Sequence, residues 1–459
     1  MDAIQLKVLH AEHVDSLARG IALALEQAGY SAAVLHAGTP QPRTRFDDQF
    51  WPLRPSPYFQ HWLPLAEPGC VLLVVPGKKP LLLRPREQSF WEALPPPETD
   101  HFWAAFEVRD IATARAAREH LPQGRTAFVG DDLAAAAAFG FADTDVNPRS
   151  LLEPLDQLRV HKTRYEIACL AEANRRAALG HEMLRAMFAQ MDYAELELHL
   201  AFLAATEQDD TEAPYKNVVA LGPHAATLHH VSYGKKAHPA QSLLVDAGAA
   251  FAGYCSDITR TWVKGGGAAA TAFAQLVAAL ESLQQKLCGQ VRVGIPYEEL
   301  HEESHRLVAN ALREVGVSRL AAEELVASGI TRAFYPHGLG HSLGLVVHDV
   351  GCALRQPRRD NPFLRNTSIV SERQVFTVEP GIYFIPALLE PLRNGKQAGA
   401  IDWDLVDQLA RLGGARIEDD VLVEGSGIRN FTREELPVGG GRPAPEVTPA
   451  AAAASPGGR

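Results

Sequence analysis

Hydrophobic and polar positions follow two different periods along the first third of the chain. Residues 14–30 (VDSLARGIALALEQAGY) place apolar side chains at helical spacing, and Gly29 is a suitable residue to end that helix. Short apolar runs bounded by Gly, Pro or charged residues predict buried strands at 31–38, 69–77, 79–86 and 125–132. Residues 110–121 predict a further helix. The pattern predicts a compact α/β unit over residues 1–158, which is a usual domain size.

Longer helical patterns dominate the following part of the chain. Apolar side chains recur at helical spacing in three long segments, 162–191, 273–291 and 297–316. Shorter apolar runs between and after them predict strands, so residues 159–436 predict a second domain and the chain an α+β fold. Residues 437–459 are Pro, Gly and Ala with almost no bulky apolar side chain, and they predict a disordered tail.

Composition and charge exclude several classes of function. The chain of 459 residues is 46% hydrophobic and 22% charged, as in an ordinary globular protein. Its formal net charge of -11 disfavours nucleic acid or an anionic membrane as the main partner. No apolar run approaches the roughly 18 residues of a membrane span, and the start lacks the pattern of a signal peptide. Five scattered cysteines without a C-x-x-C pair favour a reducing, cytoplasmic location.

Three histidines lie close together in residues 336–349 (PHGLGHSLGLVVHD). His337 and His341 have the i, i+4 spacing of a helical metal site, but the proline and glycines among them disfavour a helix. Gly338 also stands where the helical zinc motif H-E-x-x-H has its glutamate. We therefore expect a loop that runs into a strand at residues 343–350, with His348 on it. A histidine-rich surface loop is the other interpretation that the residues allow.

Two acidic residues are predicted to face each other on a β-hairpin. If the turn of SLLVDAGAAFAGYCSDITRTWV centres on Phe251 and Ala252, Asp246 and Asp257 are cross-strand partners. Such partners have Cβ atoms about 4.5–5.5 Å apart on one face of the sheet. Two carboxylates at that distance, flanked by apolar residues, favour a cation between them. Two acids on a solvated face remain the alternative.

Two further carboxylates occupy similar apolar surroundings. Glu379 lies in QVFTVEPGIYFI, and Glu418 lies in GGARIEDDVLVEG. A lone carboxylate is costly to bury without a partner. Because hard divalent cations prefer carboxylate oxygen and tolerate imidazole, two Asp, two Glu and one His predict a two-metal hydrolytic site.

The order of these motifs resembles a known family, the pita-bread metallopeptidases that include methionine aminopeptidase, aminopeptidase P and prolidase. The motifs are D-A-G-A, S-D-I-T-R-T, P-H-G-L-G-H, V-H-D-V, V-E-P-G-I-Y and R-I-E-D, and they cover roughly residues 160–435. The segments RFDDQFWPLRPSPYFQHWLPL and PYKNVVALGPHAATLHH also resemble the bacterial Xaa-Pro dipeptidases, which are related to organophosphorus acid anhydrolases. The resemblance implies a creatinase-like N-terminal domain followed by a pita-bread catalytic domain.

The resemblance assigns metal ligands residue by residue. It implies two divalent ions per chain, usually manganese with cobalt or zinc as substitutes. The implied ligands are Asp246, Asp257, His341, Glu379 and Glu418. Asp257 and Glu418 would bridge the ions. His337 and His348 match histidines of the family that contact the substrate and stabilise the tetrahedral intermediate.

Further residues match the substrate pocket of the dipeptidase branch. They are Tyr215, His229 and Arg416, together with Asp48, which matches an acid that reaches into the partner's site in a homodimer. The chain departs from the branch at three positions, His230 in place of Tyr, Cys255 in place of Ala and Ala415 in place of Ile. These departures leave all five implied ligands in place but make the shape of the pocket less certain.

The implied reaction is hydrolysis of Xaa-Pro dipeptides by a hydroxide shared between two metal ions, with organophosphorus esters as possible side substrates. Glu379 would take the proton of the water and return it to the proline nitrogen, while His348 steadies the oxyanion. Arg416 offers a fork for the free carboxylate, and Asp48 a partner for the amino group. Arg416 as a structural ion pair and Asp48 as a turn cap are the simpler alternatives.

Two other functions compete with the dipeptidase. Aminopeptidase P removes one residue ahead of proline from longer peptides, and the FDD and PYKN segments favour the dipeptidase over it. A non-catalytic binding protein of this fold is disfavoured, because such relatives have lost metal ligands and this chain retains all five.

Overall fold

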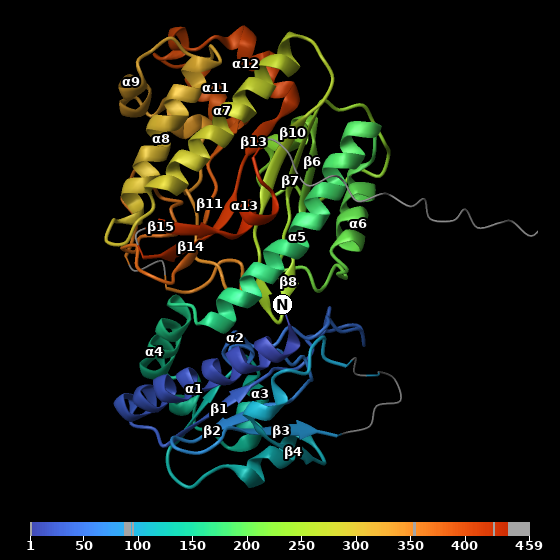
Figure 1. Ribbon diagram of the computed structural model, residues 1–459, viewed down its shortest axis with the longest axis vertical. Coiled ribbons are helices and arrows are strands. Elements are labelled where there is room, and N and C mark those ends of the chain that lie inside the picture. The colour runs from blue at the N-terminus through green and yellow to red at the C-terminus, as the bar shows by residue number, and fades with distance from the viewer. Residues whose placement is uncertain (1, 87–92, 94–95, 352–354, 426, 439–459) are drawn as a thin grey trace, which may run out of the picture.

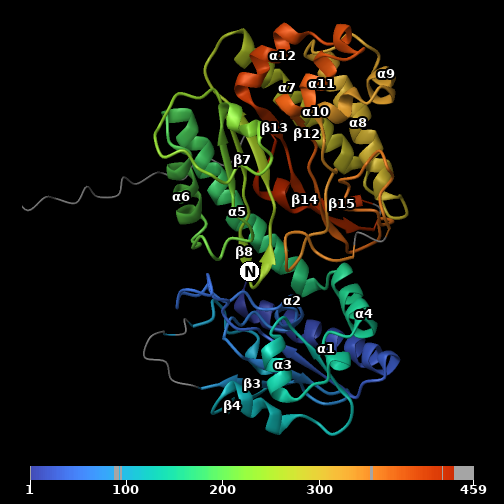
Figure 2. The same ribbon diagram turned by 180° about the vertical axis from the view of Figure 1, so that it is seen from behind.

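The computed structural model describes residues 2–86, 93, 96–351, 355–425 and 427–438, and shows two lobes (Figures 1 and 2). The N-terminal lobe comprises α1 (Ala3–Ala28), β1 (Ala32–His36), α2 (Pro57–Gln60), β2 (Val71–Val74), β3 (Leu81–Pro85), η1 (Trp103–Ala105), β4 (Glu107–Ile111), η2 (Ala114–His120), β5 (Thr126–Val129), α3 (Leu133–Phe139), η3 (Asp143–Asp145) and α4 (Arg149–Val160). The division predicted near residue 158 lies inside α4 and stays a prediction.

The five strands of the N-terminal lobe form one mixed sheet in the order β4-β3-β2-β1-β5. Strand β1 is buried throughout, pairing antiparallel with β2 and parallel with β5. One face of the sheet packs against α1 and α4 through residues such as Leu17, Ile21 and Leu155. The other face packs against α3 through Phe139. Strands β1, β2 and β5 are buried along their whole length, which explains why they are continuous apolar runs in the sequence. Strand β4 at the edge is exposed over residues 107–110 and has no such run.

The C-terminal lobe contains all the remaining elements, and its helices cover several small sheets (Figure 1). Its helices are α5 (Arg164–Gln190), α6 (Glu195–Ala205), η4 (Gly222–Ala226), α7 (Ala268–Gln290), α8 (Tyr297–Glu314), α9 (Ala322–Ala327), α10 (Ile330–Phe334), α11 (Pro386–Arg393), η5 (Ala398–Ala400), α12 (Trp403–Leu409), η6 (Ala410–Leu412) and α13 (Phe431–Glu435). Its strands are β6 (Val218–Leu221), β7 (Ser242–Asp246), β8 (Ala250–Phe251), β9 (Tyr254–Cys255), β10 (Thr259–Val263), β11 (Val375–Val378), β12 (Gly381–Tyr383), β13 (Gly414–Arg416), β14 (Asp419–Glu424) and β15 (Gly427–Asn430).

Two groups of long helices enclose the strands of this lobe. Helices α5 and α6 pack on the sheet β10-β7-β6 through a shared core that includes Phe202 and Val245. Helices α7 and α8 pack on β11, β12 and β14 through a larger core that includes Leu280 and Phe376. The strands between the helix pairs therefore end in the interior of the lobe, where buried polar side chains can meet.

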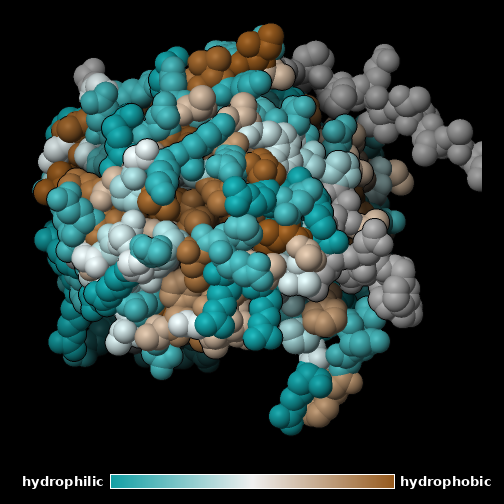
Figure 3. Space-filling view, turned by 90° about the horizontal axis from the view of Figure 1, so that it is seen from below, coloured by the Kyte–Doolittle hydropathy of each residue, from teal (hydrophilic) through white to brown (hydrophobic). Residues whose placement is uncertain are grey.

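Several predictions from the sequence are confirmed. The fold mixes helix and sheet as expected, α1 ends at Gly29 with φ 74°, and the three long helical segments are α5, α7 and α8. No helix among the described residues is long and apolar enough to cross a membrane. The end of the molecule that the N-terminal lobe forms, seen from below, mixes hydrophilic residues with hydrophobic spots (Figure 3).

Other predictions of local structure are wrong. The helix expected at 110–121 is instead the end of β4 followed by the 3-10 helix η2. The strand expected at 343–350 is absent from that described stretch, which contains bends. Asp349 explains the bends, because its carboxylate accepts hydrogen bonds from the backbone of Leu345 and Val350 and so curls the chain around itself. The tail predicted at 437–459 lies almost wholly outside the described residues.

Candidate metal centre

A cavity of about 460 Å³ in the C-terminal lobe brings together carboxylates that are far apart in the sequence. They come from the edges of strands: Asp246 ends β7, Asp257 precedes β10, Glu379 follows β11, and Glu418 lies between β13 and β14. His341, from the loop after α10, lines the same cavity. We call these five residues the cavity cluster. The structure thus brings together every residue that the resemblance names as a metal ligand.

The two aspartates meet in a different register from the one predicted. The turn centres on Ala252 and Gly253, which both have positive φ, and Asp246 pairs with Thr259 rather than with Asp257. The direct cross-strand pairing predicted for the two acids is therefore wrong. Asp257 is the diagonal neighbour of Asp246 on the same face, and side chains still reach each other across a diagonal.

Tyr215 joins the two aspartates. Its hydroxyl lies 2.8 Å from Asp246 Oδ1 and 2.5 Å from Asp257 Oδ1. Gly248 opposite Asp257 permits this arrangement, because a Cβ at Gly248 would lie 2.0 Å from the carbonyl oxygen of Ser256. The close approach of the two strands therefore requires glycine at this position.

His341 points its Nε2 at the carboxylates. That nitrogen lies 3.3 Å from Asp257 Oδ2 and 3.7 Å from Glu379 Oε1, while Nδ1 lies 3.1 Å from the carbonyl of Ser342. An Nδ1–H that donates to a carbonyl leaves a lone pair on Nε2, as in a metal-binding histidine. Burial lowers the pKa of His341, but Asp257 and Glu379 outweigh it and raise the pKa to about 9.

The cavity cluster has too much negative charge for its surroundings. Burial first, and then Asp257 and Glu379, raise the pKa of Glu418 well above its ordinary value. Burial also raises the pKa of Glu379 to about 7, although His341 and Arg416 oppose the shift. Within the described residues, Asp257, His341 and Glu418 place ligand atoms within 4.8 Å of one another. Carboxylate oxygens with one imidazole nitrogen fit hard divalent cations, whose charge would keep these groups ionised.

The two other histidines of the segment have different partners. The Nδ1–H of His337 donates to the carbonyl of Gly338 at 2.8 Å, so its Nε2 accepts from the Tyr383 hydroxyl, also at 2.8 Å. The ring of His348 lies edge-on to His341, with centroids 4.4 Å apart. Burial is the main cause that lowers the pKa of His337 to about 3 and that of His348 to about 4. Both are therefore neutral at pH 7. The single N–H of His337 is taken by the Gly338 carbonyl, whereas the N–H of His348 can donate into the cavity.

The guanidinium of Arg416 binds other side chains of the protein. Its guanidinium donates to Asp246 Oδ2 at 2.5 Å, to the Tyr383 hydroxyl at 2.7 Å and to Thr259 Oγ1 at 3.0 Å. These contacts give Arg416 a role in holding Asp246 in place. Its predicted role as a fork for the substrate carboxylate stays a prediction.

Two other predicted substrate residues lie in different settings. His229 lines the cavity, and its neighbour His230 lies 2.9 Å from the buried carboxylate of Glu195, which anchors the loop. Asp48 lies on an exposed arm closed by the pair Pro42 and Phe50, and it does not line the cavity of its own chain.

Sequence reasoning missed several residues of the cavity. Arg365 and the exposed Phe363 line it, and Tyr383 connects His337 to Arg416. Arg365 follows Phe363 in an irregular segment with no motif around it. The signal for Tyr383 was its place as the last residue of the V-E-P-G-I-Y motif, to which no role was assigned.

The chain is similar to known peptidases over almost its whole length. A model of metallopeptidase family M24 matches residues 168–425, and a model of the Xaa-Pro dipeptidase N-terminal domain matches residues 8–157. An Xaa-Pro dipeptidase of Marinobacter nauticus is 41% identical, covering 93% of this chain and 98% of the relative. One of Aeromonas hydrophila is 38% identical, covering 93% and 98%.

Solved structures confirm the pita-bread fold expected from the resemblance. Aminopeptidase P from E. coli, solved with the inhibitor Pro-Leu, superposes with a TM-score of 0.71 at 22% identity, covering 92% of this chain and 95% of that one. Proline aminopeptidase P II from Yersinia pestis gives 0.69 at 23% identity, covering 95% and 97%. The chain belongs to metallopeptidase family M24, in the group of the bacterial Xaa-Pro dipeptidases.

Proposed function

We propose that this metallopeptidase hydrolyses Xaa-Pro dipeptides with two divalent ions held by the cavity cluster. The observation that carries the proposal is the convergence of four carboxylates and the Nε2 of His341 on one buried cavity with uncompensated negative charge. The relatives similar over both halves of the chain, named Xaa-Pro dipeptidase, supply the substrate class. Manganese is the ion that we propose first, with cobalt or zinc as substitutes.

The ions, when bound, supply a hydroxide nucleophile near neutral pH. The side chains of the protein would transfer the protons and bind the substrate. Glu379 would accept a proton on its second carboxylate oxygen and return it to the proline nitrogen of the leaving group. His348 is a neutral donor on the wall of the cavity, and it would stabilise negative charge that develops on the carbonyl oxygen. His337, held by Gly338 and Tyr383, would contact the substrate with its ring.

Recognition of a dipeptide requires a partner for each of its charged ends. For the free carboxylate we propose the guanidinium of Arg416, as the resemblance implies, with Arg365, which also lines the cavity, as a second cation. For the amino group we propose Asp48 of a second copy in a homodimer. The arm that bears Asp48 exposes Phe46, Phe50 and Trp51, which supports an interface there. Tyr215 and His229 complete the wall of the pocket.

Aminopeptidase P is the competing function. The solved relatives of that name are below 25% identity and show the fold alone. We also propose a reducing, cytoplasmic location, which the four described cysteines support because they are free and buried. Side activity on organophosphorus esters stays a prediction of the resemblance.

A two-peptide assay with metal analysis tests the proposal. Purified protein loaded with manganese is offered Ala-Pro and Ala-Pro-Ala, and released alanine is measured. We expect cleavage of Ala-Pro with at least tenfold preference and about two ions per chain. Preference for Ala-Pro-Ala would assign the enzyme to aminopeptidase P, and the absence of cleavage of both peptides would overturn the proposal.

A further inference from the structure

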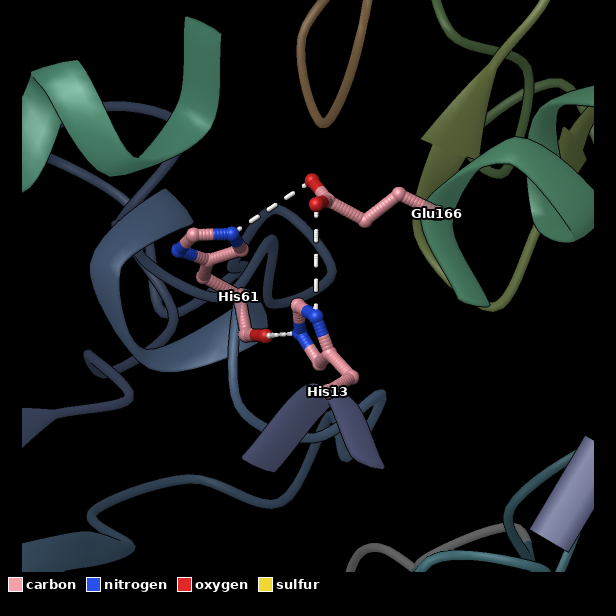
Figure 4. Close-up of side chains that lie close together, drawn as sticks. All are labelled: His13, His61 and Glu166. Atoms are coloured by element: carbon pink, nitrogen blue, oxygen red, sulfur yellow. Dashed lines mark hydrogen bonds and ion pairs between the residues drawn. The ribbon is translucent and has the colours of Figure 1, made fainter. Parts of the chain in front are cut away.

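A second cluster of histidine and carboxylate side chains lies between the two lobes (Figure 4). His13 projects from α1, His61 directly follows α2, and Glu166 lies in the first turn of α5. Their relative exposures are 1%, 5% and 1%. We call these three residues the junction cluster. It joins two elements of the N-terminal lobe to the first helix of the C-terminal lobe and has no part in the cavity.

The three side chains have the spacing of metal ligands. His61 Nε2 lies 3.4 Å from Glu166 Oε1, and His13 Nδ1 lies 3.9 Å from Glu166 Oε2. One ligand atom of each residue lies within 4.8 Å of the others. Zinc bonds of about 2.0–2.1 Å at tetrahedral angles place neighbouring ligand atoms about 3.4 Å apart. An ion therefore fits between the three with small shifts of side chains.

The hydrogen bonds around the junction cluster leave one imidazole nitrogen of each histidine available to an ion. His13 Nε2 lies 2.6 Å from the carbonyl oxygen of His61, so it carries the proton and its Nδ1 has a free lone pair. The hydroxyl of Thr163 lies 2.9 Å from Nδ1 and can donate a hydrogen bond to it, so it competes with an ion for this nitrogen. The Nε2 of His61 has no hydrogen-bond partner among the described residues.

The carboxylate of the junction cluster is held in place by the backbone. The amide of Thr163 donates to Glu166 Oε2 at 2.8 Å as part of the capping box of α5. A ligand carboxylate fixed by a backbone donor, and a ligand histidine fixed by a carbonyl, are the outer contacts that metal sites commonly have.

We propose that His13, His61 and Glu166 bind one zinc-class transition ion that clips the two lobes together. Two imidazoles and one carboxylate favour zinc, cobalt or nickel over the harder manganese or magnesium. Such an ion would have its effect on stability and on the contact between lobes, because the junction cluster does not line the cavity.

Counting bound ions tests this proposal. Protein stripped with a chelator is reloaded with zinc, desalted and analysed for metal per chain, as wild type, His61→Ala and His61→Gln. The control is His10→Ala. His10 is a buried histidine of α1, the helix that carries His13, but it is not one of the three ligands, and its Nε2 lies 2.9 Å from the Trp62 carbonyl. We expect wild type and His10→Ala to bind one zinc more per chain than either His61 variant.

Thermal unfolding supplies a second readout that does not depend on activity. Zinc should raise the Tm of wild type and His10→Ala by several degrees more than that of the His61 variants, because an ion that binds only the folded state stabilises it. Equal zinc counts and equal zinc-induced Tm shifts in folded wild type and His61→Gln would overturn the proposal and leave an ion pair between His61 and Glu166. The difference between variants stays readable even if the cavity cluster binds no ion, so failure of the proposed function would be seen separately.

Discussion

The cavity cluster and the junction cluster use the same residue types in opposite proportions. Four carboxylates face one histidine in the cavity, whereas one carboxylate faces two histidines at the junction. Burial and neighbouring acids raise the pKa of Glu418. Burial would also raise that of Glu166, yet His61, His13 and Lys162 lower it below its ordinary range.

The comparison shows that the number of carboxylates relative to histidines decides what a bound ion would do in each cluster. The cavity cluster needs added positive charge to be ionised, so the ions that we propose there would belong to its working state. The carboxylate of the junction cluster is already stabilised in its ionised form by His61, His13 and Lys162, so an ion there would add stability without being required. Removing one ligand should therefore have a much larger effect in the cavity than at the junction.

The largest expected effect comes from neutralising a bridge of the cavity cluster. Asp257→Asn and Glu418→Gln should each abolish dipeptidase activity and lower the metal content, because each removes charge shared between two cations. Activity and metal per chain are measured together, with the exposed Asp404→Asn as the control that keeps both. Full activity in either cavity variant would show that the cavity cluster is not the metal site.

A smaller loss of activity is expected when a hydrogen-bond donor beside the cavity cluster is removed. His348→Ala should lower kcat more than tenfold, the lower range for losing one positioned donor, while the metal content stays at the wild-type level. The edge-on contact of His348 with His341 makes this a strict test, because a ligand role would also fit that proximity. A fall in metal as steep as that of the Asp257 variant would place His348 among the ligands.

The sequence predicted the members of the cavity cluster better than their geometry. Asp246, Asp257 and Glu379 stand out because each is an acid beside an apolar strand, which is costly without a partner. Their exact pairing depends on one turn, and a shift of that turn to Ala252 and Gly253 changed the partner of Asp246. Local alternation does not specify which of two adjacent residues, here Phe251 or Ala252, begins a turn.

Contacts between segments far apart in the sequence could not be predicted. The bends at 343–350 follow from Asp349, which Arg159 from α4 pairs with across 190 positions of the chain. The engagement of Arg416 by Asp246 and Tyr383 likewise depends on tertiary structure. The junction cluster was also missed, since its three residues share no motif and meet only where the lobes meet.

A pH-dependent effect is expected beside the junction cluster. Burial lowers the pKa of His101 to about 4, and its Nε2 lies 3.0 Å from the Tyr165 hydroxyl. The unfolded chain has a histidine pKa near 6.5, so the stabilising effect of neutral His101 is present above that pH and is lost as pH falls toward 4. Urea unfolding measured at pH 7 and at pH 5 gives the fall in the free energy of unfolding between the two pH values. This fall should be smaller by about 1 kcal/mol in His101→Gln than in wild type. The exposed His238→Gln is the control, and an equal decrease in all three proteins would refute a buried neutral His101.

The smallest expected effect concerns Asp48 and whether the cavity is complete within one chain. The arm with Asp48 is exposed and lies outside the cavity of its own chain, so any contact with substrate has to come from a second copy. Asp48→Ala should raise KM for Ala-Pro about threefold, as for a partly exposed ion pair worth somewhat under 1 kcal/mol, with kcat and metal content unchanged. Discrimination against N-acetylated Ala-Pro should weaken in parallel, whereas the neighbouring Asp47→Ala should change neither quantity. Sedimentation at assay concentration completes the test, because a fully active monomer, or unchanged selectivity in Asp48→Ala, would mean that the cavity needs nothing from a partner.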